Sequence, residues 1–209
     1  MSKALVIVFV KNMKLGKVKT RLAKTIGNQA AFEVYKELVQ ITESATSKLP
    51  IDKRIYFSEA IVDTKWPGDY KTVQEGADLG ARMKQAFSQG FKDGYEHIVL
   101  IGSDLPDISD KHIKAGIQAL NNYDTVFGPA EDGGYYLIGL SKMTSCVFEN
   151  KPWSTSHLLK ETLSELQQKN ISFTTLDTLN DIDTFEDLEA SNFYRTNKNL
   201  QQKIKLLNA

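Results

Sequence analysis

Two continuous apolar runs limit the folds open to this sequence. The first, ALVIVFV, covers residues 4–10, and the second, HIVLIG, covers residues 97–102. Both are rich in valine and isoleucine and lack polar alternation, which is typical of strands covered on both faces. Such strands occur in sheets that carry helices on either side, so the runs favour an α/β protein.

Helical and strand-like segments alternate along the rest of the chain. Helices are expected over residues 28–48, 79–91, 109–122 and 156–170, with a further one that opens at Thr184. Short strands are expected at 53–58, 70–74, 125–128, 135–140 and 171–176. This alternation predicts a three-layer α/β/α fold with a mostly parallel sheet.

No internal repeat, low-complexity segment or linker divides the sequence, so residues 1–209 are expected to form one domain. The tail, about 196–209, is expected to be peripheral, as a helix that docks on the body or on a second subunit. Whether the protein is a monomer or a homodimer stays open.

Composition excludes several classes of function. Lys plus Arg equals Asp plus Glu at 26 each, whereas broad nucleic-acid binding needs a basic surface. The single cysteine, Cys146, forms no internal disulfide and lacks a partner for zinc. The first apolar run is too short to span a membrane and precedes no cleavage site of small residues. We therefore expect a cytoplasmic protein without a membrane span and without a nucleic-acid partner.

Charged residues collect directly after the predicted strands. The segment after the first strand carries only basic residues and a flexible Gly16: Lys11, Lys14, Lys17, Lys19, Arg21 and Lys24. Acids follow three later strands: Asp104 and Asp107; Glu131 and Asp132; Asp177, Asp181 and Asp183. Ligands of open α/β sheets bind beyond the carboxyl ends of strands. One basic and three acidic strand ends predict a site for magnesium and phosphate, since magnesium prefers oxygen ligands and basic residues neutralise phosphate.

Other catalytic motifs are absent from the sequence. The basic segment lacks the glycine and Gly-Lys-Ser/Thr pattern of a Walker loop, and no G-x-G-x-x-G follows the first strand. The residues around Ser141 lack the closing glycine of a nucleophile elbow. His97, His112 and His157 are scattered and are interpreted as structural.

Six ordered motifs resemble one bacterial family. These motifs are KLGKVKTRLA, DLGARM, GSDLPDI, GPAEDGGYYLIGL, PWSTS and DIDTFEDL, and the resemblance that they carry spans about residues 4–190. They resemble the rSAM/selenodomain-associated transferase 1 family, which is glycosyltransferase-like and similar to phospholactate and molybdenum-cofactor guanylyltransferases. The resemblance implies the GT-A nucleotide-diphospho-sugar transferase fold.

The resemblance also implies roles for individual residues. The basic segment would grip the nucleotide phosphates through Lys11, Gly16, Lys17, Lys19 and Arg21. Asp78, Leu79 and Gly80 would lie near the base and sugar, and Asp104 and Asp183 would hold Mg²⁺ or Mn²⁺. The chain departs from the family by lacking a proline in NMKLG and by carrying Phe185 where relatives have proline.

The stretch EDGG is expected to meet the acceptor. Gly133 and Gly134 would let the backbone approach it, while Asp132 would hold an acceptor group or reach the metal beside Glu131. One of Tyr135 and Tyr136 would face the site, because neighbours on a strand point to opposite faces. Trp153 would line the same cleft or belong to the core. A solvated Gly-Gly turn is the plainer alternative.

Three functions remain open at this level. The leading hypothesis is nucleotidyl transfer from a nucleoside triphosphate to a phosphorylated small molecule, with Lys19, Arg21, Asp104 and Asp132 as catalytic residues. The alternative is a glycosyltransferase that uses a nucleotide-diphospho-sugar and employs Asp132 or Glu131 as base. The third is a nucleotide-binding module without catalysis. The substrate partners are therefore a nucleotide and a small-molecule acceptor.

Overall fold

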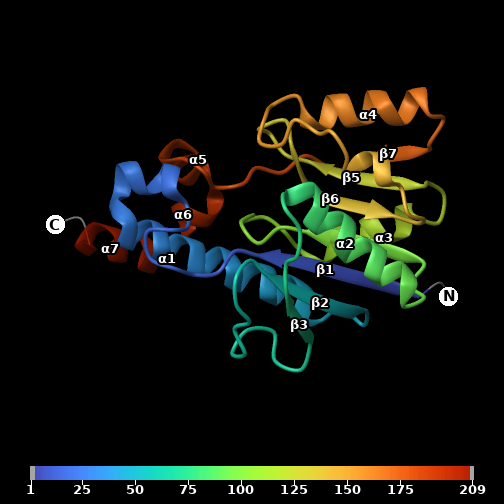
Figure 1. Cartoon of the computed structure of the whole chain (residues 1–209). Coiled ribbons are helices and arrows are strands. Elements are labelled where there is room, and N and C mark those ends of the chain that lie inside the picture. The colour runs from blue at the N-terminus through green and yellow to red at the C-terminus, as the bar shows by residue number, and fades with distance from the viewer. Residues whose placement is uncertain (1–2, 208–209) are drawn as a thin grey trace.

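The computed structural model describes residues 3–207 and is built around one twisted seven-stranded sheet (Figure 1). The strand order is β3-β2-β1-β4-β6-β5-β7. The strands are β1 (Ala4–Val10), β2 (Asp52–Phe57), β3 (Tyr70–Val73), β4 (His97–Ile101), β5 (Thr125–Pro129), β6 (Tyr135–Leu140) and β7 (Phe173–Thr175). Only β6 runs antiparallel to its neighbours, so the predicted mostly parallel sheet is confirmed.

Helices cover both faces of the sheet and complete the predicted three layers. Residues of β1 alternate between the two faces: Val6 and Val8 share a core with α1 and α3, whereas Leu5 and Ile7 share one with α2 and α4. The apolar run at residues 4–10 is continuous because both faces of β1 are buried. The longer helices are α1 (Thr20–Ser47), α2 (Leu79–Lys92), α3 (Asp110–Ala119) and α4 (Leu158–Gln168), and a short 3₁₀ turn covers Ser145–Val147.

Helix α1 begins at Thr20, whereas the sequence predicted a start at residue 28. Gly27 has non-helical torsions (φ 78°, ψ 157°) and kinks the helix, so the turns before it follow a different axis. Leu22 and Ile26 in these turns are buried in a third apolar cluster with the C-terminal helices. The basic residues and Gly27 concealed this helical spacing in the sequence.

The C-terminal helices pack against the first half of α1 (Figure 1). They are α5 (Phe185–Ala190), α6 (Asn192–Thr196) and α7 (Lys198–Leu207). Leu200 and Ile204 of α7 are buried in the third cluster, and Lys203 pairs with Glu33 of α1 at 2.5 Å. Of the two docking modes considered for the tail, the structure shows docking on the body. Among residues 3–207, no helix has the length and apolar character needed to cross a membrane.

Candidate active site

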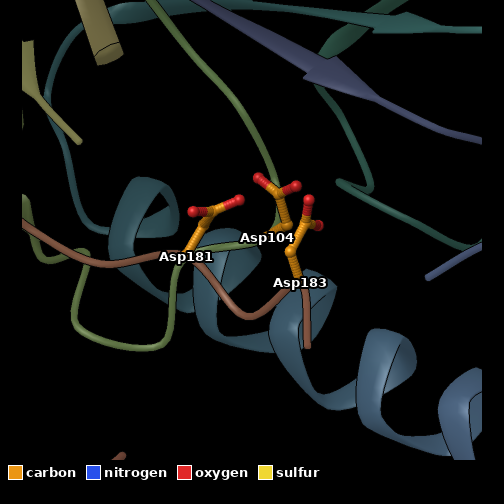
Figure 2. A group of neighbouring side chains, drawn as sticks. All are labelled: Asp104, Asp181 and Asp183. Atoms are coloured by element: carbon orange, nitrogen blue, oxygen red, sulfur yellow. The ribbon is translucent and has the colours of Figure 1, made fainter. Parts of the chain in front are cut away.

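Three aspartates from two distant segments meet beyond the carboxyl ends of the strands. Asp104 follows β4, while Asp181 and Asp183 lie on the segment between β7 and α5. Figure 2 shows their carboxylates turned toward one another, and one oxygen from each lies within 4.8 Å of the others. All three residues are half-buried. Three carboxylate oxygens at this spacing fit the hard oxygen ligands that Mg²⁺ and Mn²⁺ take.

Backbone contacts hold the second segment in place. The N–H of Glu131 donates to the carbonyl of Leu179 at 3.1 Å, which ties the segment to the end of β5. Thr184 and Asp187 form the predicted capping box at the start of α5. Oδ2 of Asp187 also accepts from the N–H of Asp183 at 3.1 Å, so the helix cap fixes the backbone of a candidate metal ligand.

Two basic side chains reach the aspartates from the start of α1. Lys19 Nζ lies 3.0 Å from Oδ2 of Asp104 and 3.1 Å from Oδ1 of Asp183. Its side chain is only 5% exposed. Arg21 Nη1 lies 3.1 Å from Oδ2 of Asp183 and is largely exposed. The predicted basic and acidic strand ends therefore lie in direct contact.

The backbone at Lys19 is unusual for a lysine. It caps α1 in the left-handed region (φ 45°, ψ 49°). Non-glycine residues held there cost about 1–3 kcal/mol and cluster at functional sites. From this position the Lys19 side chain contacts Asp104 and Asp183.

The three carboxylates of the acidic cluster are partly buried and repel one another. Burial, and then the carboxylate of Asp104, raise the pKa of Asp181 to about 6, while Lys19 lowers it. Burial lowers the pKa of Lys19, but Asp104 and Asp183 raise it more, so its pKa lies above the usual value. Lys19 thus stays charged, and a further cation would relieve the remaining repulsion.

A cavity of about 620 Å³ opens beside the aspartates, and we call it the phosphate cavity. Its basic lining residues are Lys11, Lys19, Arg21 and Arg82, and Asp104 and Asp183 lie on its wall. On its wall, the hydroxyl of Tyr35 contacts Ser103 Oγ and the backbone of Lys11. This volume lies within the usual range for small-molecule sites.

Of the other residues predicted to bind the nucleotide, not all line the phosphate cavity. Leu79 is exposed and lines the cavity. Asp78 caps α2 by accepting from the N–H of Ala81 at 2.8 Å. Gly80 packs closely, since a Cβ there would lie 2.4 Å from the carbonyl oxygen of Phe148. Gly16 adopts φ +74°. Lys17 is exposed to solvent and does not line the phosphate cavity.

The EDGG stretch forms the tight link between β5 and β6. Glu131 and Asp132 are exposed, and Oδ1 of Asp132 accepts from the N–H of Gly134 at 2.8 Å. The carbonyl of Gly133 accepts from the N–H of Leu159 at 3.0 Å, so the link also contacts the start of α4. Asp132 lines a second cavity with Asp104 and Asp181, which places it beside the acidic cluster.

Gly133→Ala is expected to destabilise the fold by about 3 kcal/mol or more, because φ is +88° and the new Cβ would lie 2.1 Å from the carbonyl oxygen of Ser156. Gly134→Ala is the matched control, since its Cβ would meet only the Asp132 carboxylate, at 3.1 Å. Urea unfolding measures both variants. Equal stabilities would show that the Gly133 turn moves away from Ser156.

Tyr135 and Tyr136 point to opposite faces of β6, as expected for neighbours on a strand. Tyr135 packs edge-on against Phe127, and its hydroxyl is enclosed without a hydrogen-bond partner in the described residues. Tyr136 donates to the carbonyl of Asp177 at 3.1 Å. Both residues border the space beside the acidic cluster, although their rings belong to the cores on opposite faces of the sheet. Trp153 is half-buried and borders this space as well.

Several residues at the site had been given no specific role from the sequence. Asp181 was named among the acids that follow the predicted strands, but only Asp104 and Asp183 were expected to hold the metal, although the motif DIDT places Asp181 two positions before Asp183. Tyr35 and Arg82 lie on α1 and α2, where helical periodicity identifies Tyr35 as a core residue and Arg82 as a surface residue. No pattern in the sequence indicates that either residue borders a cavity.

Sequence comparison finds a family and an informative relative. The model of the family described as "Uncharacterized protein conserved in bacteria (DUF2064)" matches residues 50–155. A 2-phospho-L-lactate guanylyltransferase of Methanocaldococcus infernus is 28% identical over 121 residues. That alignment covers 56% of this chain and 53% of the relative, so the chain spans about half the length of this curated protein.

Solved structures share the whole architecture. A proposed nucleotide-diphospho-sugar transferase of Desulfovibrio desulfuricans G20 has a TM-score of 0.89 and 34% identity, with 99% of this chain and 97% of that chain covered. The inositol-1-phosphate CTP transferase of T. maritima has a TM-score of 0.56 and 15% identity, with 98% of this chain and 97% of that chain covered. A Mycobacterium tuberculosis H37Rv protein in complex with manganese has a TM-score of 0.53 and 14% identity, with 90% and 97% covered. The last two show the fold alone.

These matches confirm the predicted nucleotide-diphospho-sugar transferase type of fold. The match to the family model covers the second to sixth strands, including Asp104 and the EDGG link. The chain therefore belongs to the DUF2064 family of bacterial proteins.

Proposed function

We propose that this protein is a metal-dependent nucleotidyltransferase that joins a nucleotide to a phosphorylated small molecule and releases pyrophosphate. One observation carries the proposal: Lys19 and Arg21 contact Asp104 and Asp183 on the wall of a cavity large enough for a nucleotide. The relation to a 2-phospho-L-lactate guanylyltransferase supports the same class of reaction. The narrower membership in the rSAM/selenodomain-associated transferase 1 family remains part of this proposal.

The basic residues would bind the triphosphate. Lys11, Arg82, Lys19 and Arg21 line the phosphate cavity and would neutralise the phosphate oxygens. Lys19 and Arg21 lie closest to the aspartates and would stabilise the charge that develops on the leaving pyrophosphate. A phosphate nucleophile is already ionised at neutral pH, so the reaction needs no general base.

Asp104, Asp181 and Asp183 would hold a divalent cation. Their oxygen ligands suit magnesium or manganese, and the manganese complex of the M. tuberculosis protein supports a divalent metal in this fold. When bound, the cation would supply Lewis acidity and neutralise phosphate charge. The three carboxylates come from two segments, so they would also fix the distance between those segments.

Thermal unfolding tests nucleotide binding. The protein is heated with each nucleoside triphosphate and with a panel of nucleotide sugars, with and without magnesium. A triphosphate at about 100 times its dissociation constant adds about 2.7 kcal/mol, which for a chain of this size raises the Tm by about 5–10 °C. A magnesium-dependent rise with one triphosphate, and pyrophosphate release with an acceptor, are expected. No rise with any triphosphate would overturn the proposal.

Glycosyl transfer is the second candidate, favoured by Asp132 at the edge of the acidic cluster. There Asp132 would accept the proton of an acceptor hydroxyl while the cation holds a nucleotide diphosphate. A rise in Tm with a nucleotide sugar but with no triphosphate would select this reaction. Asp132→Asn would then abolish transfer to the acceptor hydroxyl.

A further inference from the structure

Two cavities beside the aspartates have four lining residues in common. One is the phosphate cavity, and the other is the second cavity, of about 310 Å³, which Asp132 lines. The shared residues are Leu79, Gly102, Asp104 and Ser154. In the proposed reaction the triphosphate occupies the phosphate cavity, so an acceptor in the second cavity must bring its phosphate to the nucleotide past these four residues.

Of the four shared residues, only Ser154 has a side chain that can donate a hydrogen bond. Leu79 is apolar, and the carboxylate of Asp104 accepts hydrogen bonds and is a candidate metal ligand. Gly102 has no side chain, and its backbone N–H donates to the carbonyl of Tyr136 at 3.4 Å. Phosphate oxygens are acceptors, so the Ser154 hydroxyl is the shared side chain that can bind an acceptor phosphate.

The hydroxyl of Ser154 is available for this contact. Ser154 is exposed, and its side chain has no hydrogen-bond partner among residues 3–207. The next hydroxyl along the chain differs, because Thr155 Oγ1 donates to the carbonyl of Pro152 at 2.8 Å. A phosphate bound at Ser154 would therefore break no hydrogen bond within the protein.

The backbone of Ser154 is unusual for a serine. Its φ is +62°, in the left-handed region that favours glycine. Non-glycine residues held in this region are strained, and they cluster at active sites and ligand sites. Glycine would suit the turn better, so the local fold alone does not account for a serine at this position.

Packing on both sides of Ser154 holds it in place. A Cβ at Gly80 would lie 2.8 Å from Cζ2 of Trp153, and a Cβ at Gly133 would lie 2.1 Å from the carbonyl oxygen of Ser156. The start of α2 and the EDGG link therefore approach the neighbours of Ser154 too closely for any larger residue. These contacts fix the hydroxyl between the two cavities before a substrate binds, which lowers the entropic cost of binding.

We infer that the Ser154 hydroxyl donates a hydrogen bond to the phosphate of the acceptor and positions it for attack on the nucleotide. This inference rests on the proposed nucleotidyl transfer and assigns an acceptor-binding residue to that same site. Lys19 and Arg21 would bind the triphosphate, whereas Ser154 would hold the attacking phosphate beside it. Holding the two reacting groups together in this way accelerates their reaction.

A titration with inorganic phosphate, the smallest phosphate that the second cavity can take, tests the inference. Phosphate is titrated calorimetrically into the protein with magnesium and a saturating α,β-methylene triphosphate, which fills the phosphate cavity and cannot release pyrophosphate. A hydrogen bond to a charged group is among the stronger ones. Ser154→Ala is therefore expected to bind phosphate at least about tenfold more weakly than the parent protein, with the affinity for the triphosphate analogue changed less than about twofold.

Ser156→Ala is the matched control for this change. Ser156 is exposed in the same segment and lines neither cavity, so its loss should leave phosphate binding within about twofold of the parent protein. Equal phosphate affinities in the parent protein and Ser154→Ala, including no binding to either, would overturn the inference.

Ser154→Gly separates the contact with phosphate from a purely structural role. Glycine relieves the left-handed strain, so this variant is expected to resist urea better than Ser154→Ala does. It lacks the hydroxyl and should bind phosphate as weakly as Ser154→Ala. Phosphate affinity that recovers together with stability in Ser154→Gly would contradict the proposed hydrogen bond.

The outcomes also separate this inference from the proposed function. Binding of a triphosphate, together with phosphate affinities that Ser154 does not affect, would refute the role of Ser154 and leave nucleotidyl transfer intact. Failure of every triphosphate to bind would refute nucleotidyl transfer and, with it, the role of Ser154.

Discussion

Asp104→Asn is expected to lower metal-dependent pyrophosphate release by at least about 100-fold. Loss of a group that merely orients a metal ligand already costs about 10- to 100-fold in metal affinity or activity, and Asp104 is itself one of the three candidate ligands. An asparagine oxygen can still accept from Lys19 Nζ, so the free energy of unfolding should change by less than about 1 kcal/mol. Steady-state pyrophosphate release and urea unfolding measure the two effects.

Asp107→Asn is the matched control for this change. Asp107 belongs to the same loop and carries the same group, but it is exposed and lines neither the phosphate cavity nor the second cavity. Its activity should stay within about twofold of the parent protein, as expected of a surface change. An active Asp104→Asn protein would remove the aspartate cluster from the mechanism. Equal losses in both variants would indicate disruption of the loop instead.

The layered fold could be predicted because its signals are local. Residues 4–10 and 97–101 are buried on both faces, and each reads as a strand without reference to its neighbours. The antiparallel pairing of β5 with β6 also has a local cause, since residues 130–134 are too few for a parallel crossover. The position of β6 between β4 and β5 depends on packing across the whole sheet and has no such signal.

The sequence predicted the site only as charged residues that follow the carboxyl ends of several strands. Acids that follow parallel strands meet at one edge, which brought Asp104 and Asp183 into the prediction. The sequence could not show why residue 133 must be glycine, because the atoms that a Cβ there would meet belong to Ser156, on another segment. Lys19 was expected at the phosphates from the sequence, but its contacts with Asp104 and Asp183 and its left-handed backbone were not.

Lys19→Met is expected to change stability, metal binding and activity together. Removal of the ammonium leaves Asp104 and Asp183 without their shared partner. Breaking a buried ion pair costs about 3–5 kcal/mol, but these carboxylates are 38% and 40% exposed, so solvent screening reduces the expected loss to about 1–2 kcal/mol. Activity should fall about 100- to 1,000-fold with the loss of a cation that stabilises developing phosphate charge.

Metal binding distinguishes this role of Lys19 from a purely structural one. In the parent protein a divalent cation must compete with the ammonium for two of its three candidate ligands. The variant should therefore bind manganese about tenfold more tightly, equal to about 1.4 kcal/mol, and recover its lost stability when the metal is added. Lys24→Met, an exposed change in the same helix, should alter neither property. Weaker manganese binding in Lys19→Met would show that the lysine organises the aspartates for the metal instead of occupying its place.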